Sequence, residues 1–569
     1  MTRMNARRMN AARMGRSNIS VGDRLPYQAP CLFLPRLFLL CLFITFTFSS
    51  CSKNSAQESS ESVTINLVHT PEISVFLESA AKLFALTNPT LPGNTPIKIA
   101  LSSSSSISAA NSISSGEIKT HGWLASSSAL IDYVNSRRTN LGPQQIDCRQ
   151  LFATPVVAAV QEGSRYKLNP TGNTFSWREF FSARSESNNK YSTSFMHLPP
   201  QKNVSGLASI MQLAYFSAVQ SGEFINLEST NTKAALANFA FFESFVGQYP
   251  TNDFNMLSSL ASFPSEKAVF ALTTEQQLAN FNKSRAPGTQ ALSALYPSEG
   301  SYWENYNLCL SDADWVSAAQ RAGLRKFTDF LASDQMQLRV KQEGFRPYVV
   351  NIAEMPPLTK AFGVDTSLPT ISLNPAPGDV VDFVLAQWGQ IVRPSATMIV
   401  FDSSGSMDKA LPYGQEKFRN WLAATSKRDL KGLISFEGEV DKPIALTADE
   451  TVVIHALDSL RSIGGSAVYD AVKRAVEALS SQDLRPFRKN LVLFTDGGDK
   501  NSQVSIDLLA DYVHHKVMAD NISIFIIALT QPDSDFSDLK RIVKESGGIF
   551  REAYLSDMEP VFGEILGLL

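Results

Sequence analysis

The sequence predicts an α/β protein with mostly parallel sheets, divided into two parts. From residue 63 onward, short β-branched runs alternate with stretches of helical period, which is typical of strands and helices that follow one another. Near the end of the chain, the apolar runs at 397–401 and 491–494 each stop at an aspartate. Strands of an open parallel sheet end in this way at the edge where ligands bind.

Composition is that of a globular protein with several domains. The chain has 569 residues, 44% of them hydrophobic and 18% charged, and one domain usually takes about 100–200 residues. A net charge of −3 gives no reason to expect binding to nucleic acid or to an anionic membrane surface.

Residues 1–50 are predicted to be a basic leader followed by a signal peptide. Residues 37–50 are uncharged, and their length fits the apolar region of a signal peptide better than a membrane span. Small residues precede Cys51, and this segment resembles the cleavage site of bacterial lipoproteins. The resemblance implies a lipidated Cys51, a polar linker over 51–62 and a place in the cell envelope facing the periplasm or cell surface, whereas an uncleaved anchor is the alternative. Ser52 is not the aspartate of an inner-membrane retention signal, which favours the outer membrane.

The first domain is predicted from its alternating elements. Strands are expected at 63–68, 97–101, 123–125 and 154–160, and helices at 71–86, from 175, from 205 and at 318–344. Over residues 63–362 their order resembles a two-lobed solute-binding protein of the periplasmic type. In that fold a small solute lies between the lobes, held by hydroxyls and helix amino termini. The candidates are Ser104, Ser127, Thr154 and Ser205.

Each of these four residues has a simpler interpretation. A serine or threonine at a junction between strand and helix often only caps the helix, and we expect Ser205 to cap the helix that begins there. The serine run at 102–106 could equally be a flexible loop.

Residues 363–393 are predicted to be a connector and a helix. Prolines and glycines between 362 and 378 indicate an irregular segment, and 379–392 has the pattern of an amphipathic helix. We expect this helix to pack on the domain that follows it. Further strands at 432–436 and 522–529 and a last helix near 558–569 would complete a doubly wound sheet there.

The cysteines predict one disulfide. Of the five cysteines, Cys148 and Cys309 remain once the leader is removed and Cys51 is acylated. An even pair in an oxidising compartment favours a bond between them, and two buried free thiols are the alternative.

Asp402, Ser404 and Ser406 are candidate metal ligands. They follow the strand 397–401, in a segment whose Asp-Ser-Ser-Gly-Ser sequence cannot continue a buried strand and must turn. Oxygen ligands of this kind suit Mg²⁺, Mn²⁺ or Ca²⁺. The simpler alternative is that these residues cap the next helix.

Two further loops offer oxygen donors to the same edge. Ser466 follows a glycine turn, and Asp496 ends the apolar strand that begins at 491. With all three loops, residues 394–569 resemble the von Willebrand factor type A domain and its metal-ion-dependent adhesion site. The resemblance makes Asp402, Ser404, Ser406, Ser466 and Asp496 the ligand set. The sequence departs from the family in having Ser466 where threonine is usual, and Gly498 where many relatives carry an acidic residue.

These patterns predict a binding protein. We expect a lipid-anchored envelope protein whose metal captures an Asp or Glu of a protein partner, because few direct carboxylates leave the cation under-neutralised. The alternative is a solute receptor whose second domain relays or scaffolds. An enzyme is not predicted, since the six histidines form no His-Glu-x-x-His and neither a Gly-x-Ser-x-Gly elbow nor a Walker loop occurs.

Overall fold

A computed structural model describes the chain from residue 62 onward with short gaps. The described residues are 62–185, 193–219, 223–263, 268–348, 354–532, 534–546, 548–567 and 569. The predicted leader, the lipidated Cys51 and nearly all of the linker lie outside them. Within the described part, no helix combines the length and the apolar character that crossing a membrane requires.

The first domain contains a sheet whose two halves share a pair of long strands. In the sheet the strand order is β2-β3-β1-β4-β11-β5-β9-β7-β8. The first half pairs β1, β3 and β4 in parallel, and β11 runs antiparallel to both β4 and β5. The far end of β5 pairs with β9 and β10 of the second half. The strands are β1 (Val63–His69), β2 (Thr90–Leu91), β3 (Thr95–Ser103), β4 (Gly122–Ala125), β5 (Gln144–Gln161), β6 (Thr174–Phe175), β7 (Thr193–Met196), β8 (Val246–Gln248), β9 (Ala268–Thr274), β10 (Leu292–Pro297), β11 (Trp303–Asp312) and β12 (Arg346–Pro347).

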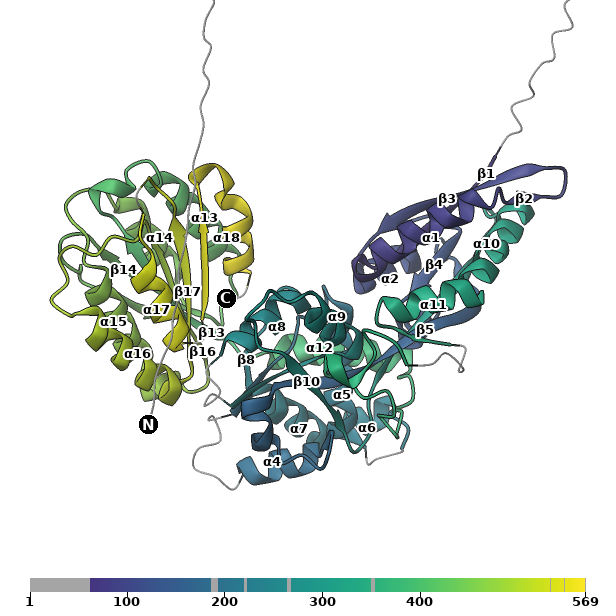
Figure 1. Cartoon of the computed structure of the whole chain (residues 1–569), viewed down its shortest axis with the longest axis horizontal. Helices are drawn as coiled ribbons and strands as arrows, with labels where there is room; N and C mark the ends of the chain where they lie inside the picture. The colour runs from purple at the N-terminus through teal and green to yellow at the C-terminus, as the bar shows by residue number, and fades with distance from the viewer. Residues whose placement is uncertain are drawn as a thin grey trace, which may run out of the picture. The chain divides into compact units, whose positions relative to one another are not determined.

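Helices cover each half, so that each half forms a lobe, and one of the buried cores continues from the first lobe into the second. The first lobe carries η1 (Pro71–Ile73), α1 (Ser74–Leu86), α2 (Ser106–Ser115), α3 (Ser128–Arg137), α10 (Ala318–Leu331) and α11 (Asp334–Gln342). The second carries η2 (Glu162–Leu168), α4 (Trp177–Ser185), α5 (Val204–Ala218), α6 (Leu227–Thr230), α7 (Lys233–Glu243), α8 (Asp253–Ser262), α9 (Glu275–Ser284) and η3 (Lys360–Phe362). Two lobes joined by shared strands match the predicted architecture (Figure 1).

Two of the helix predictions for this domain need correction. The helix expected over 318–344 is two helices, because Ser333 adopts an extended conformation (φ −66°, ψ 151°) and begins the second one. The helix expected from Ser205 begins one residue earlier, with Asn203 at the N-cap position. The Ser205 hydroxyl instead donates to Asp253 Oδ2 at 2.8 Å. The serine run at 102–106 is the end of β3 followed by the start of α2 rather than a loop throughout.

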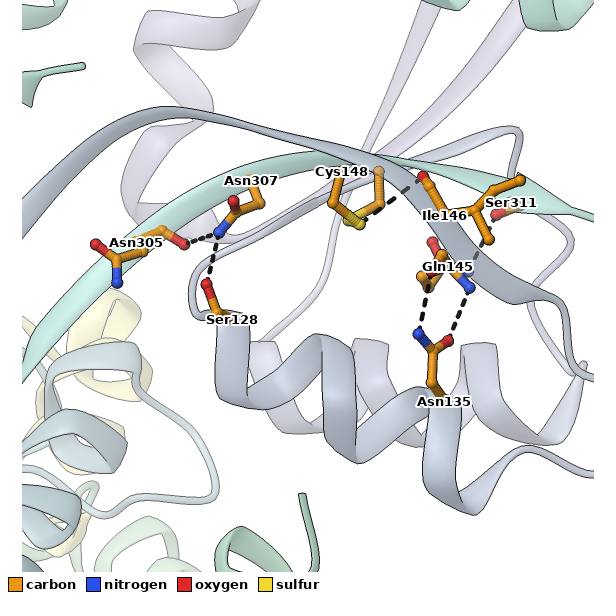
Figure 2. The surroundings of a disulfide bond; sticks show 9 residues. Ser128, Asn135, Gln145, Ile146, Cys148, Asn305, Asn307 and Ser311 are labelled. Atoms are coloured by element: carbon orange, nitrogen blue, oxygen red, sulfur yellow. Dashed lines mark hydrogen bonds between the residues drawn. A yellow bond between two sulfur atoms is a disulfide. The ribbon is translucent and has the colours of Figure 1, made fainter. Parts of the chain in front are cut away.

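The predicted disulfide is present and joins the two shared strands. Cys148 on β5 is bonded to Cys309 on β11, across 161 residues of sequence. Figure 2 shows the bond between these two paired strands, near α3. Beside it, the Asn135 side chain of α3 makes hydrogen bonds to both the N–H and the carbonyl of Gln145, at 2.8 and 3.1 Å. The disulfide and these bonds fix β5 to the first lobe.

The helix α12 (Gly378–Ile391) contacts the first domain with its apolar face. It packs on α3, α5 and α6, and its N-terminal Gly378 N–H donates to Asp132 Oδ2 at 2.6 Å. Arg137 of α3 forms an ion pair with Asp382. The prediction that this face packs on the second domain is therefore wrong. Its buried residues share a core with α3 and α5, and they are Val380, Val381, Val384 and Trp388.

The second domain is a doubly wound sheet. Its strand order is β15-β14-β13-β16-β17-β18, with parallel pairing except at the edge strand β15. Helices α13, α14 and α18 cover one face of the sheet, and α15, α16 and α17 cover the other (Figure 1). The elements are β13 (Ser395–Asp402), η4 (Gly405–Met407), α13 (Leu411–Ala424), β14 (Leu430–Phe436), β15 (Ile444–Thr447), α14 (Glu450–Ser459), α15 (Val468–Leu479), η5 (Gln482–Leu484), β16 (Arg488–Thr495), α16 (Ile506–Asp520), β17 (Ile522–Leu529), α17 (Ser537–Ser546), β18 (Ile549–Ala553), η6 (Leu555–Asp557) and α18 (Met558–Leu566).

Candidate metal centre and interlobe site

The centre of the sheet places two aspartates at the same edge. β13 is buried along its whole length and ends at Asp402, and its neighbour β16 ends at Thr495, directly before Asp496. The two strands are parallel, with Phe401 opposite Phe494. Because parallel strands end together, their loops open at one edge, as the sequence predicted.

Asp402 is a buried carboxylate held by two hydrogen bonds. Its Oδ1 accepts from the Ser404 N–H at 2.9 Å, and its Oδ2 accepts from the Thr495 hydroxyl at 2.5 Å. Burial raises its pKa from 3.8 to about 6, and the two hydrogen bonds oppose that rise. A carboxylate that is costly to ionise when bare gains most from a nearby cation.

The first and second loops are joined through their backbones. Ser404 Oγ and Ser406 Oγ lie 3.2 Å apart. The Ser462 hydroxyl donates to the Ser404 carbonyl at 2.5 Å, and the Gly405 N–H donates to the Gly464 carbonyl at 3.2 Å. Gly464 has φ +73°, a conformation that favours glycine. The glycine turn seen in the sequence thus brings the second loop against the first.

Ser466 ends this turn with a hydroxyl that has no partner. The residue is 3% exposed, and its Oγ makes no hydrogen bond within the described part of the chain. Its backbone is fixed from both sides, since its N–H donates to Asn501 Oδ1 at 3.1 Å and its carbonyl accepts from the N–H groups of Lys500 and Asn501. A buried hydroxyl without a partner is rare and calls for an explanation. A metal ion bound by Ser466 Oγ would supply one.

The third loop contributes Asp496 and a partner that the sequence did not reveal. Asp496 Oδ2 accepts from Gln531 Nε2 at 2.9 Å, and the same nitrogen donates to the Ser406 carbonyl at 3.2 Å. Gln531 therefore ties the third loop to the first. The signal that could have found it is its position just after β17, the strand beside β16. Thr495 and Asn501 were also missed, although Thr495 directly precedes Asp496.

The donor set fits a hard cation. The hydrogen bonds described above link all three loops that carry the five predicted residues. The side chains of these five residues offer two carboxylates and three hydroxyls as metal ligands. In the described residues no three His, Cys, Asp or Glu side chains are placed to share a metal ion. A site here would depend on hydroxyl oxygens, which Mg²⁺ and Ca²⁺ accept and softer metals do not prefer.

The four residues predicted to bind a solute in the first domain each contact a different part of the chain. Ser127 Oγ accepts from the Ala129 N–H at 3.2 Å and so caps α3. Thr154 Oγ1 accepts from the Gln276 N–H at 3.1 Å, at the start of α9. Ser104 follows β3, and its N–H donates to the His69 carbonyl. For Ser127 and Thr154, the simple capping interpretation describes what the side chain does.

Ser205 leads to a group of buried acids that the sequence did not reveal. Its hydroxyl and that of Thr273 donate to Asp253, at 2.8 and 2.6 Å. Burial raises the pKa of Asp253 from 3.8 to about 6. Burial likewise raises the pKa of Glu72, and raises that of Glu304 well above its usual range. These residues lie far apart in sequence and have no local motif.

Asp253 should make the protein less stable as the pH rises. Its folded pKa of about 6 exceeds the unfolded value of 3.8, so the folded state retains this proton when the unfolded state has lost it. The stabilisation is full below pH 4 and is lost as the pH rises through 6, by about 3 kcal/mol in all. Asp253→Asn should flatten the dependence of unfolding free energy on pH between 4 and 7, measured by urea unfolding. An unchanged slope would contradict the assignment.

Comparison with known proteins identifies the second domain. Residues 397–498 match the family model of the von Willebrand factor type A domain, which confirms the predicted family of this domain. Among solved structures, BatB from Bacteroides thetaiotaomicron is 16% identical, with 30% of this chain and 97% of that chain covered and a TM-score of 0.26. No curated protein matches the chain.

Other solved structures match the first part of the chain. AfuA, a periplasmic binding protein from Actinobacillus pleuropneumoniae, is 13% identical, with 58% of this chain and 98% of that chain covered and a TM-score of 0.40. Iron-bound HitA from Pseudomonas aeruginosa is 14% identical, with 58% and 99% covered and a TM-score of 0.40.

Proposed function

We propose that this protein is an envelope-anchored binding protein whose second domain uses a divalent metal to capture an acidic group of a protein partner. The observation that carries the proposal is the buried Ser466 hydroxyl. Among the residues that the structure describes it has no hydrogen-bond partner, and it belongs to a loop that is hydrogen-bonded to the loop of Asp402, Ser404 and Ser406. A metal ion bound to Ser466 Oγ would account for the missing hydrogen bond.

In this proposal, Asp402 and the hydroxyls of Ser404, Ser406 and Ser466 hold Mg²⁺, or Mn²⁺ or Ca²⁺ in its place. Asp496 acts beside them and is positioned by Gln531. Such a cation supplies positive charge that one direct carboxylate does not balance, which favours an anionic ligand from outside. A partner's Asp or Glu carries that charge. The role is binding rather than catalysis, and hydrogen bonds of this chain prepare the site.

The anchoring part of the proposal depends on the leader. Lipidation at Cys51 would hold the protein at the cell envelope, facing the periplasm or the cell surface, and Ser52 favours the outer membrane. Both residues lie outside the described part of the chain. The partner that the metal would reach must therefore be another envelope protein or an extracellular one.

Capture in the presence and absence of metal tests the proposal. We expect the immobilised full-length chain to retain a partner from envelope extracts in 5 mM Mg²⁺, and to release it in EDTA, because the proposed bond runs through the metal. Addition of Mg²⁺ or Mn²⁺ should restore retention. Capture that is equal in EDTA and in Mg²⁺ would rule out a metal-dependent role for the retained partner.

A solute receptor is the second candidate, and the shared strands favour it. β5 and β11 are paired along the first lobe, and β5 continues into the second, so these strands connect the two lobes. In this proposal the first domain binds a small solute and the second domain relays or scaffolds. Solute binding that EDTA leaves unchanged would separate this function from the first.

A further inference from the structure

A hollow of about 780 Å³ opens at the carboxyl ends of β17 and β18, on the edge of the sheet that carries the candidate metal centre. The two strand ends are joined there, since the Thr530 N–H donates to the Ala553 carbonyl at 2.9 Å. Residues before and within the first turn of α17 form one side of the hollow, and residues at and after the end of β18 form the other. The hollow is therefore built from the loops that follow two neighbouring parallel strands.

The hollow adjoins the metal centre directly. Thr530 lines the hollow, and the next residue, Gln531, donates to Asp496 Oδ2 at 2.9 Å. On the same side, the ring of Phe536 lines the hollow and lies against Gly497, where an added β-carbon would come within 2.5 Å of two ring atoms. A protein segment bound at the metal would therefore continue over this hollow if it followed the sheet edge in this direction.

The hollow carries an excess of negative charge. Its charged side chains are Asp535, Glu552, Asp557 and Lys540, and Lys540 Nζ lies 3.4 Å from the Glu552 carboxylate. Asp535 accepts from the Ser537 N–H at 2.9 Å, and this hydrogen bond lowers its pKa, so that it is ionised at neutral pH. Within the described part of the chain, the Asp557 side chain makes no capping hydrogen bond to α18, which it precedes. One ammonium group thus faces three carboxylates.

An exposed aromatic ring lies in the same hollow as these carboxylates. Tyr554 is 61% exposed, although it is a large aromatic side chain, and it lines the hollow together with Asp535 and Asp557. The face of a tyrosine ring attracts a cation, and carboxylates beside it add to that attraction. The guanidinium of arginine is planar, stacks on aromatic rings and presents five N–H donors, whereas the ammonium of lysine lacks a planar face. The hollow therefore suits arginine.

We propose that this hollow receives an arginine side chain of the same partner segment that offers an Asp or Glu to the metal. The proposal rests on the metal-dependent function and names the motif that the partner carries. Opposite charges then meet at two neighbouring points, since the cation takes the partner's carboxylate and the hollow takes its guanidinium. Complementary charges at two points fix the direction in which the segment lies as well as its position.

The spacing of the strands sets the spacing of the motif. Neighbouring strands lie about 4.8 Å apart, so β17 and β18 lie about 5 and 10 Å from β16, which ends beside Asp496. An extended segment advances about 3.4 Å per residue. The arginine should therefore lie about two to four residues from the acidic residue in the partner's sequence.

Fluorescence anisotropy with labelled peptides and the full-length chain tests the motif. The probes are glycine-serine nonapeptides with one Glu and, two to four positions away on either side, one Arg. Matched peptides carry Gln in place of Arg, or Gln in place of Glu. In Mg²⁺ we expect the best peptide with Glu and Arg to bind at least about fivefold more tightly than its match with Glu and Gln. Peptides without Glu should not bind, and EDTA should release all the others.

Variants of the hollow locate the arginine. Asp535→Asn combined with Asp557→Asn should lower binding of the Arg peptide to the level of the Gln peptide, and should leave both the Gln peptide and Mg²⁺ binding unchanged. Asparagine at 535 keeps an oxygen for the Ser537 N–H, so that the start of α17 is preserved. The control is Asp483→Asn combined with Asp511→Asn, which removes the same charge from exposed residues of η5 and α16 and should have no effect.

Two results would overturn the arginine assignment while the metal-dependent function stands. One is equal Mg²⁺-dependent binding of the Arg and Gln peptides to the wild type. The other is an arginine effect that survives in the double variant of the hollow, since the guanidinium would then bind elsewhere. Binding that is equal in EDTA and in Mg²⁺ for every peptide would overturn the metal-dependent function and this assignment together.

Discussion

Asp402→Asn should abolish metal binding while the second domain stays folded. Asparagine keeps an oxygen for the Ser404 N–H but removes the charge of the buried carboxylate. We expect the affinity for Mg²⁺ to fall by more than about 100-fold, since loss of outer contacts alone costs about 10–100-fold in metal sites. Removal of a carboxylate whose pKa burial has raised to about 6 should cost little stability in EDTA. Calorimetric titration with Mg²⁺ and a thermal melt in EDTA measure the two effects.

Two further variants make the Asp402 result specific. Asp402→Ala should also abolish metal binding. It should lower stability by about 1–3 kcal/mol, because the Ser404 N–H and the Thr495 hydroxyl lose their acceptor. Asp408→Asn removes an exposed carboxylate of the same loop and should bind Mg²⁺ as the wild type does. Metal uptake by Asp402→Asn equal to that of the wild type would place the metal elsewhere.

Among the variants considered, loss of the disulfide should lower the free energy of unfolding most. Cys148→Ser combined with Cys309→Ala opens a loop whose ends are 161 residues apart. The chain-entropy model gives a stabilisation of about 4–5 kcal/mol for a loop of this length. Alanine is chosen at 309 because that position is fully buried and a serine hydroxyl there would lack a partner. The measurement is urea unfolding of the first domain within the full-length chain, followed by a probe in that domain.

Reduction of the wild type provides the control for the disulfide. Dithiothreitol should shift the same transition toward the midpoint of the double variant, and should leave the double variant itself unchanged. Thiol counting on denatured, non-reduced protein should find neither Cys148 nor Cys309 free. A double variant as stable as the wild type would mean that the hydrogen bonds between Asn135 and Gln145 already fix β5 to α3.

The sequence alone determined the features that depend on neighbouring residues. A buried strand cannot continue into Asp-Ser-Ser-Gly-Ser, so the run ending at Asp402 required a turn, and β16 with Asp496 followed the same rule. β17 was predicted with its observed bounds because Ile522–Leu529 is mostly apolar and contains four isoleucines. Pairing of Cys148 with Cys309 followed from the number of cysteines left after the leader.

Only the tertiary structure decided which distant groups meet. The apolar stripe of α12 would suit either domain, and the packing on α3 and α5 depends on side chains more than 150 residues away. Gln531 reaches Asp496 because β17 lies beside β16, an order that no local pattern records. Glu72, Asp253 and Glu304 look like ordinary surface acids in the sequence. Asp253 and Glu304 become buried only in the folded chain, and that burial raises their pKa values.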